Sequence, residues 1–111
     1  MSAISIKDYD EIMAVINQYF KGNNTSGEEI KKAFHPNATM NAQPIQTLFE
    51  AIDKLAPGEA VGRADILDVS GDIASVRCIL ENCYGKKYVD FLLLLKTGNE
   101  WKIVSKLYQE V

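Results

Sequence analysis

The C-terminal half of the chain alternates between apolar and polar positions, and pairs that contain glycine interrupt the alternation. Gly71-Asp72, Gly85-Lys86 and Gly98-Asn99 are typical of tight turns between antiparallel strands. They divide the segment after Ala60 into four predicted strands: 61–70, 73–84, 87–96 and 101–108. The third strand is too short for a membrane span and indicates burial on both faces. Three hairpins in series predict a four-stranded antiparallel meander.

Apolar residues in the N-terminal half recur at helical spacing in three segments. The first predicted helix begins at Asp8 and ends near Gly22, with apolar positions Tyr9, Ile12, Met13, Ile16, Tyr19 and Phe20. A short second helix is capped by Ser26 and stops at His35-Pro36. Two extended pieces, 38–41 and 44–47, precede a third helix that is capped by Thr47 and carries Leu48, Phe49, Ile52 and Leu55.

Helices followed by a run of strands are typical of α+β proteins, in which the helices cover one face of an antiparallel sheet. With 111 residues, of which 47% are hydrophobic, the chain is long enough to bury a core without a metal or a disulfide. We therefore expect one domain over residues 1–111, with three helices on one face of a curved sheet.

The register of two-residue turns would sort the strand residues onto two faces. One face is apolar through its middle and is assigned to the concave side under the helices: Leu67, Val69, Ala74, Val76, Cys78, Leu80, Val89, Phe91, Leu93, Leu95 and Val104. The other face mixes large apolar and charged groups, and is too apolar to face water. We expect it to form a homodimer interface that contains Arg77, Ile79, Glu81, Asp90, Leu92, Trp101 and Ile103. A three-residue turn at Gly85 would exchange the faces of strand 73–84 relative to strand 87–96.

Charge and short motifs exclude several classes of function. A net charge of −3, with scattered lysines, argues against nucleic acid or an anionic membrane as a partner. The N-terminus lacks the features of a signal peptide, so we expect a cytoplasmic protein. Phosphate-binding loops, zinc motifs and the nucleophile elbow are missing from the sequence, and we expect neither a metal nor a cofactor. Cys78 and Cys83 lie too far apart along one predicted strand to form a disulfide.

Polar side chains gather at one end of the predicted concave face, where they would line a pocket. The candidate pocket residues are Tyr19, His35, Asn41, Asn82, Phe91, Lys106 and Tyr108. Lys106 has apolar and aromatic neighbours on its face, and a lysine in such surroundings pairs with an anion or loses its charge. It is either a pocket cation for an acidic or carbonyl ligand, or a side chain that reaches water from the sheet edge.

The other candidates also have two interpretations. His35 is either a general base or ligand donor, or a structural group at a helix end. Tyr19 and Tyr108 are either catalytic acids or half-buried core aromatics. Asp90 and Glu81 would suit acid/base catalysis, but on the expected interface face an ion pair with Arg77 explains them better.

The whole chain resembles the nuclear transport factor 2-like (cystatin-like, SnoaL-like) superfamily, and within it the putative lumazine-binding group. The similarity is carried by Tyr19 ahead of Gly22-Asn23-Asn24, and by the segments 33–38, 68–76, 88–92 and 101–106. The resemblance implies a cone-shaped α+β barrel of three helices on a bent sheet, a pocket between the first helix and the concave face, and frequent dimerisation through the outer face. It also implies that enzymatic members place aspartates, histidines or tyrosines inside the cone.

Three functional hypotheses follow. The first is a small-molecule-binding domain with an apolar cone pocket and a polar mouth. The second is an enzyme of the isomerase or dehydratase kind that uses His35 and Lys106 as an acid/base pair, which requires both groups to reach one ligand position. The third is a non-catalytic interaction module whose outer face, with Trp101 exposed, recruits a partner.

Overall fold

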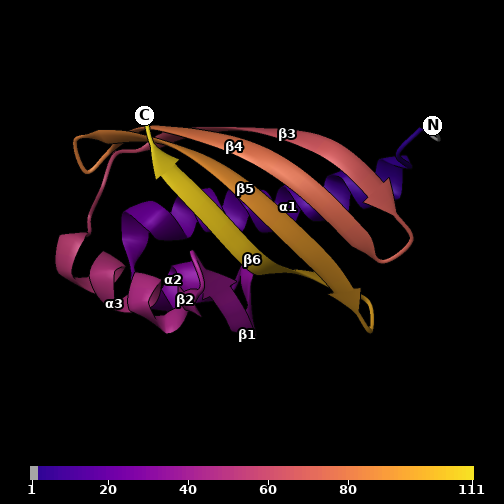
Figure 1. Cartoon of the computed structure of the whole chain (residues 1–111), viewed down its shortest axis with the longest axis horizontal. Coiled ribbons are helices and arrows are strands. Elements are labelled where there is room, and N and C mark those ends of the chain that lie inside the picture. Colours follow the sequence, from indigo (N-terminus) through magenta and orange to yellow (C-terminus); the bar gives the residue numbers. More distant parts are fainter. Residues whose placement is uncertain (1–2) are drawn as a thin grey trace.

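The computed structural model describes residues 3–111 as three helices and six strands in one α+β unit. The helices are α1 (Ile6–Thr25), α2 (Gly27–Lys31) and α3 (Gln46–Leu55). The strands are β1 (Phe34–Met40), β2 (Gln43–Pro44), β3 (Val61–Ser70), β4 (Ile73–Cys83), β5 (Lys86–Thr97) and β6 (Glu100–Glu110). The α+β class, the helices-first order and the meander β3–β6 are as predicted (Figure 1).

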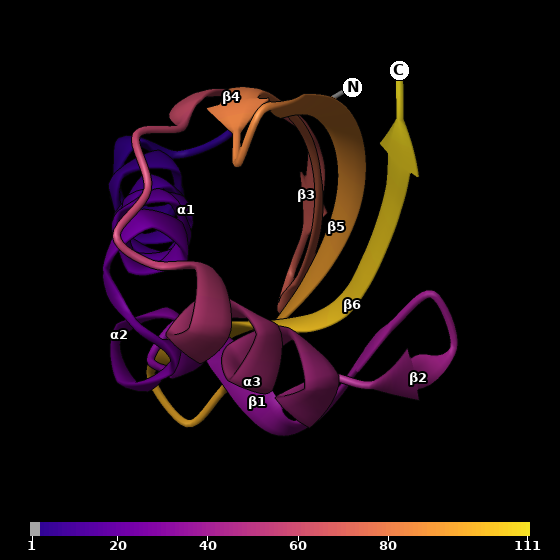
Figure 2. The same cartoon turned by 90° about the vertical axis from the view of Figure 1, so that its left-hand side faces the viewer.

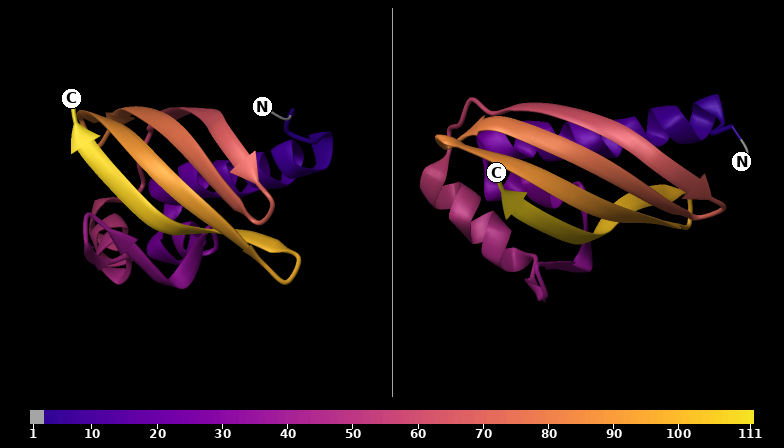
Figure 3. Two further views of the ribbon diagram at one scale, coloured as in Figure 1. Left: turned by 45° about the vertical axis from the view of Figure 1, so that its right-hand side comes forward. Right: turned by 45° about the horizontal axis from the view of Figure 1, so that its top comes forward.

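The sheet is strongly curved, and its concave side faces the helices (Figures 2 and 3). Its strand order is β2-β1-β6-β5-β4-β3, so β2 and β3 are its two edges and the sheet is not closed into a barrel. All neighbouring pairs are antiparallel except β1 with β6, which run parallel. The meander β3–β6 is antiparallel, as predicted, and the parallel pairing of β1 with β6 is one that the sequence did not predict.

The core lies between α1 and the concave face. Ile12, Ile16 and Tyr19 of α1 are buried against the apolar middle of the sheet, which includes Val76, Cys78, Leu80, Leu92 and Leu94. Both cysteines are free and buried, as expected. Within residues 3–111, no helix is long and apolar enough to cross a membrane.

The observed helix boundaries differ from the predicted ones at several positions, where hydrogen bonds to the backbone explain the difference. The N-cap of α1 is Ser5, whose hydroxyl accepts from the Asp8 amide, and not Asp8 itself. The N-cap of α2 is Ser26, as predicted. Thr47 lies inside α3, and its hydroxyl donates to the Pro44 carbonyl. Phe34 belongs to β1 and pairs with Ile103, because β6 offers backbone partners that a longer second helix would forgo.

The predicted faces of strand 87–96, which corresponds to β5, are wrong. The β4–β5 register is not that of a simple two-residue turn at Gly85-Lys86. Cys83 pairs with Lys86, so the turn is Tyr84-Gly85, and a register shift follows between Leu80 and Cys83. Asn82, Tyr84 and Gly85 all have positive φ angles there, of 54°, 52° and 84°. Between the pairs Leu80–Tyr88 and Cys83–Lys86, β4 has one residue more than β5. This extra residue reverses which residues of β5 share a face with Leu80.

The reversal moves four of the seven expected dimer-interface residues into the core. Asp90, Leu92, Trp101 and Ile103 are 0–3% exposed beneath the helices, while Arg77, Ile79 and Glu81 stay on the outer side. Phe91 and Leu93, expected in the cone, are 55% and 52% exposed on the convex surface. A second shift at Val104 in β6 then turns Lys106 inward after Ile103.

Candidate functional site

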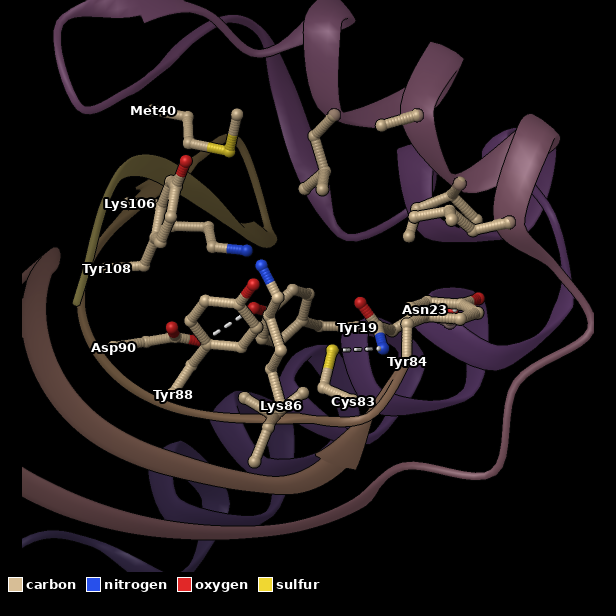
Figure 4. Close-up of a pocket in the computed structure, with 15 residues that line it drawn as sticks. Tyr19, Asn23, Met40, Cys83, Tyr84, Lys86, Tyr88, Asp90, Lys106 and Tyr108 are labelled. Atoms are coloured by element: carbon tan, nitrogen blue, oxygen red, sulfur yellow. Dashed lines mark hydrogen bonds between the residues drawn. The ribbon is translucent and has the colours of Figure 1, made fainter. Parts of the chain in front are cut away.

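A pocket of about 310 Å³ opens between α3 and the concave face of the sheet (Figure 4). Its apolar wall is formed by Met40, Leu48, Ala51, Ile52, Leu55, Leu80 and Cys83. Its polar groups are Tyr19, Asn23, Tyr84, Lys86, Tyr88, Asp90, Lys106 and Tyr108. Elements far apart in the sequence, from α1 to β6, therefore supply one site.

Tyr19, Asp90 and Lys106 form the buried polar end of this pocket. The Tyr19 hydroxyl donates a hydrogen bond of 2.6 Å to Asp90 Oδ2, and both residues are 1% exposed. The Lys106 ammonium lies over the Tyr19 ring at 4.9 Å and over the Tyr108 ring at 5.4 Å, in cation–π geometry. Among residues 3–111, no carboxylate oxygen lies within 4.0 Å of Lys106 Nζ.

Burial shifts the pKa of each group toward its neutral form. Burial raises the pKa of Asp90, although the Lys106 charge and the Tyr19 hydrogen bond oppose the shift. Burial lowers the pKa of Lys106, against the attraction of Asp90. Burial and the neighbouring Asp90 raise the pKa of Tyr19 well above its usual range, so the phenol remains a donor at physiological pH. Asp90 and Lys106 thus place a proton acceptor and an amine in the same pocket.

Tyr84 and Asn23 shape the rim of the pocket at the end of α1. The Tyr84 hydroxyl donates to the Asn23 carbonyl at 2.6 Å, and Asn23 Nδ2 donates to Cys83 Sγ at 3.4 Å. Lys86 lines the same side, and its ammonium pairs with Glu110 at 3.5 Å. These contacts tie the left-handed turn after β4 to the C-terminal end of α1.

The structure brings together three of the seven candidate pocket residues: Tyr19, Lys106 and Tyr108 line the cavity. The other four lie outside its wall. His35 Nδ1 accepts from the Asn37 amide, and Phe91 is on the convex surface. Asn41 exchanges two hydrogen bonds with the Tyr108 backbone, and Asn82 is exposed at the register shift.

Asp90 is the functional candidate that the sequence placed on the wrong face. One signal could have found it: a lysine in apolar surroundings needs an anion, and Asp90 is the one acidic residue in predicted strand 87–96. The pocket-lining residues of α3 had no signal of their own, because their apolar stripe reads equally as core.

The chain is similar to several known proteins over nearly its whole length. The family described as Putative lumazine-binding matches residues 7–109. The aldolase FrzH of Cladobotryum sp. is 26% identical over 116 residues, which cover 95% of this chain and 93% of that protein. An NTF2-like protein of unknown function from Methylobacillus flagellatus KT has a TM-score of 0.90 and 31% identity, with 97% of this chain and 95% of that chain covered.

A second NTF2-like protein of unknown function, from Shewanella baltica OS155, has a TM-score of 0.85 and 28% identity, with 99% and 98% of the two chains covered. A domain from Nostoc punctiforme PCC 73102, described as having a cystatin-like fold, shares the architecture at a TM-score of 0.80 and 15% identity, with 97% of this chain and 80% of that chain covered. Together with the pocket, these similarities indicate a small-molecule-binding domain. The chain belongs to the putative lumazine-binding family of the NTF2-like superfamily, whose cystatin-like fold it adopts.

Proposed function

We propose that the pocket binds a small, largely apolar organic molecule through a carbonyl or acidic oxygen, and that Lys106 contacts this oxygen. The observation that carries the proposal is a buried amine, with no carboxylate within 4.0 Å among residues 3–111, at the polar end of a pocket that also has an apolar wall. A ligand oxygen would supply the partner that the protein does not place there.

The size and lining of the pocket limit the ligand. At about 310 Å³ the pocket is at the small end of ligand sites, which suits a molecule of one or two rings. Tyr19, Tyr88 and Tyr108 offer ring faces and edges against which a planar or alicyclic ring packs. A bicyclic compound with a ring carbonyl has this chemistry, and the pteridine implied by the family's description is one example.

A ketone should stabilise the protein more than its hydrocarbon analogue does. The test compares thermal unfolding with lumazine, with the bicyclic ketone decalone and with the hydrocarbon decalin. At 100 times its Kd a ligand adds about 2.7 kcal/mol, which raises Tm by several degrees in a domain of this size. We expect Lys106→Met to lose the preference for the ketone, whereas Lys96→Met, outside the pocket, should keep it. Equal shifts with decalone and decalin in the wild type would contradict the assignment of Lys106.

A second candidate function is proton transfer at the carbon next to a carbonyl. It is favoured by the presence of Asp90 and Lys106 in one pocket. Asp90, which is held by its hydrogen bond from Tyr19, can accept a proton, and the Lys106 amine can stabilise an enolate oxygen. The 26% identity to the aldolase FrzH supports the same class of chemistry. The expected pair of His35 and Lys106 has no such support, because His35 does not line the pocket.

Deuterium exchange tests this activity without knowledge of the natural substrate. Incubating decalone with the protein in D2O should replace its α-protons faster than buffer does, as followed by NMR. Exchange no faster than with the heat-denatured chain would overturn the proposal of catalysis and leave the binding proposal standing.

We also propose that a second copy of this chain covers the convex face of the sheet. Phe91 and Leu107 are register neighbours on β5 and β6, with Leu93 two positions along, and each is more than half exposed. Water-facing apolar side chains that adjoin across strands are typical of an interface, and a two-fold axis lets one patch cover itself.

Sedimentation should therefore show a dimer that Leu93→Glu converts to a monomer, because the substitution buries a carboxylate against apolar side chains. Ile6→Glu is the matched control: Ile6 is 80% exposed, but on α1 and away from the convex face. A monomeric wild-type chain would sink the dimer proposal.

A further inference from the structure

Lys106 differs from the other lysines of the described residues in being buried, with 6% of its surface exposed. It projects from β6 into the pocket, and its ammonium lies between the Tyr19 and Tyr108 rings (Figure 4). Exposed lysines such as Lys32 and Lys87 have carboxylate partners at 2.8 Å and 3.5 Å. Lys106 has none within 4.0 Å among residues 3–111, which leaves its Nζ directed at the space that a ligand would occupy.

We propose that Lys106 Nζ is a nucleophile that forms an imine with the carbonyl carbon of an aldehyde or ketone bound in the pocket. The inference rests on the proposed function, which places a carbonyl oxygen near this amine, and it adds a covalent step. It narrows the ligand class to aldehydes and ketones, because carboxylates and amides do not form imines with an amine in water at neutral pH.

The step balances without an oxidant or a second reactant. The lone pair of the neutral amine attacks the carbonyl carbon, and the π electrons move to the oxygen, which takes up a proton. The nitrogen loses a proton to give a carbinolamine. The carbinolamine hydroxyl is protonated and leaves as water while the nitrogen lone pair closes the C=N bond of an iminium. Loss of the remaining N–H proton then gives the imine, so the ketone and the lysine amine together give an imine and one water.

Asp90 is placed to relay protons in this step. Its carboxyl lines the same pocket as Lys106, and the Tyr19 hydroxyl holds Oδ2 at 2.6 Å. Because burial raises its pKa, this carboxyl binds a proton more readily at neutral pH than an exposed aspartate does. Because no carboxylate oxygen of the described residues lies within 4.0 Å of Lys106 Nζ, one bridging water would carry a proton from nitrogen to Asp90 and from Asp90 to the departing hydroxyl.

The surroundings of Lys106 favour the neutral amine that the attack requires. Burial lowers its pKa, and the attraction of Asp90 opposes this. The titratable and charged groups around it come from four elements: Tyr19 from α1, Cys78 and Cys83 from β4, Lys86, Tyr88 and Asp90 from β5, and Tyr108 from β6; the lining residues of α3 and β1 are apolar. Burial and Asp90 raise the pKa of the Cys78 thiol to about 12, which keeps it uncharged, and Lys86 is paired with Glu110.

Reductive trapping tests the imine. The wild-type chain is incubated with decalone and sodium borohydride at neutral pH, and hydride converts any iminium to a stable secondary amine. Peptide mapping should find a single adduct, on Lys106. Lys96→Met should keep that adduct, while Lys106→Met should lose it. Lys106→Arg, which retains the charge and length but cannot form the imine, covers the case in which the methionine variant fails to fold.

Two outcomes would overturn the inference. One is a decalone adduct that is distributed over the exposed lysines and reaches the same total level in the wild type and in Lys106→Arg. The other is label at Lys106 that falls with decreasing pH in parallel with the exposed lysines, since a buried amine should remain reactive at lower pH than they do. Thermal shifts with decalol, which cannot form an imine, separate the two proposals: stabilisation by decalol without an adduct leaves the binding function intact and removes only the covalent step.

Discussion

Replacing Asp90 by Asn should slow the deuterium exchange of decalone by about two orders of magnitude or more, the usual effect of losing a positioned general base. The amide keeps an oxygen that can accept a hydrogen bond from the Tyr19 hydroxyl, as Asp90 Oδ2 does at 2.6 Å. The substitution should therefore preserve this hydrogen bond and the shape of the pocket. What is lost is the ability to hold the proton that leaves the carbon. NMR exchange rates for the two proteins measure the effect.

Controls separate chemistry from folding. Glu81→Gln makes the same carboxyl-to-amide change on an exposed side chain outside the pocket and should leave the exchange rate unchanged. Asp90→Leu removes the acceptor as well and leaves a buried phenol unpaired, which should cost about 1–3 kcal/mol of stability. Equal exchange rates for wild type and Asp90→Asn would show that Asp90 is not the base.

Asp90→Asn also isolates one contribution to the pH dependence of folding. Burial raises the pKa of Asp90 above its ordinary value of 3.8, so the folded protein holds this proton more tightly than the unfolded chain. As the pH rises from 3.8 through the raised pKa, the free energy of unfolding falls. The asparagine side chain does not titrate in this range, so the variant does not lose this free energy. The stability of Asp90→Asn relative to wild type should therefore increase as the pH rises from 3.8 through the raised pKa. Urea unfolding at several pH values measures the difference, and a constant difference would contradict the shifted pKa.

The role of Asp90 shows where prediction from the sequence stops. The strand boundaries were predictable because glycine-containing turns mark them, and β3 has the predicted span of 61–70. The faces were not, because Leu92–Leu95 is apolar throughout and carries no alternation to fix its register. One unpaired residue between Leu80 and Cys83 was enough to move a carboxylate from the expected dimer interface to the pocket.

Lys106 was placed correctly for an incomplete reason. The reversal of β5 carries Trp101 and Ile103 inward with it, which would have turned Lys106 outward. The shift at Val104 restores it to the concave side. Alternation can therefore predict that a strand has two faces, but the irregular pairings that aim individual side chains into a site depend on long-range partners.

Gly22→Ala should destabilise the protein by about 3 kcal/mol or more, near the upper end of overpacking effects. A Cβ at this position would lie 2.2 Å from Ile30 Cα and 2.3 Å from Ile30 N. These are backbone atoms of α2 and cannot rotate away, so α1 and α2 would have to separate. The sequence suggested that Gly22 ends the first helix, yet α1 continues to Thr25, and the glycine serves the close approach of two helices.

The sign of this change decides between two physical effects. Helix propensity alone makes alanine better than glycine by about 1 kcal/mol, so without the clash the variant would gain stability. Ala14→Gly, at an exposed site of the same helix, reports propensity alone and should lose about 1 kcal/mol. Urea unfolding of the wild type and the two variants gives the comparison. A Gly22→Ala variant more stable than the wild type would refute the close packing of Gly22 against the Ile30 backbone. Because Asn23 follows directly and holds Tyr84 and Cys83 at the rim, separating α1 from α2 should also weaken ligand binding in the pocket.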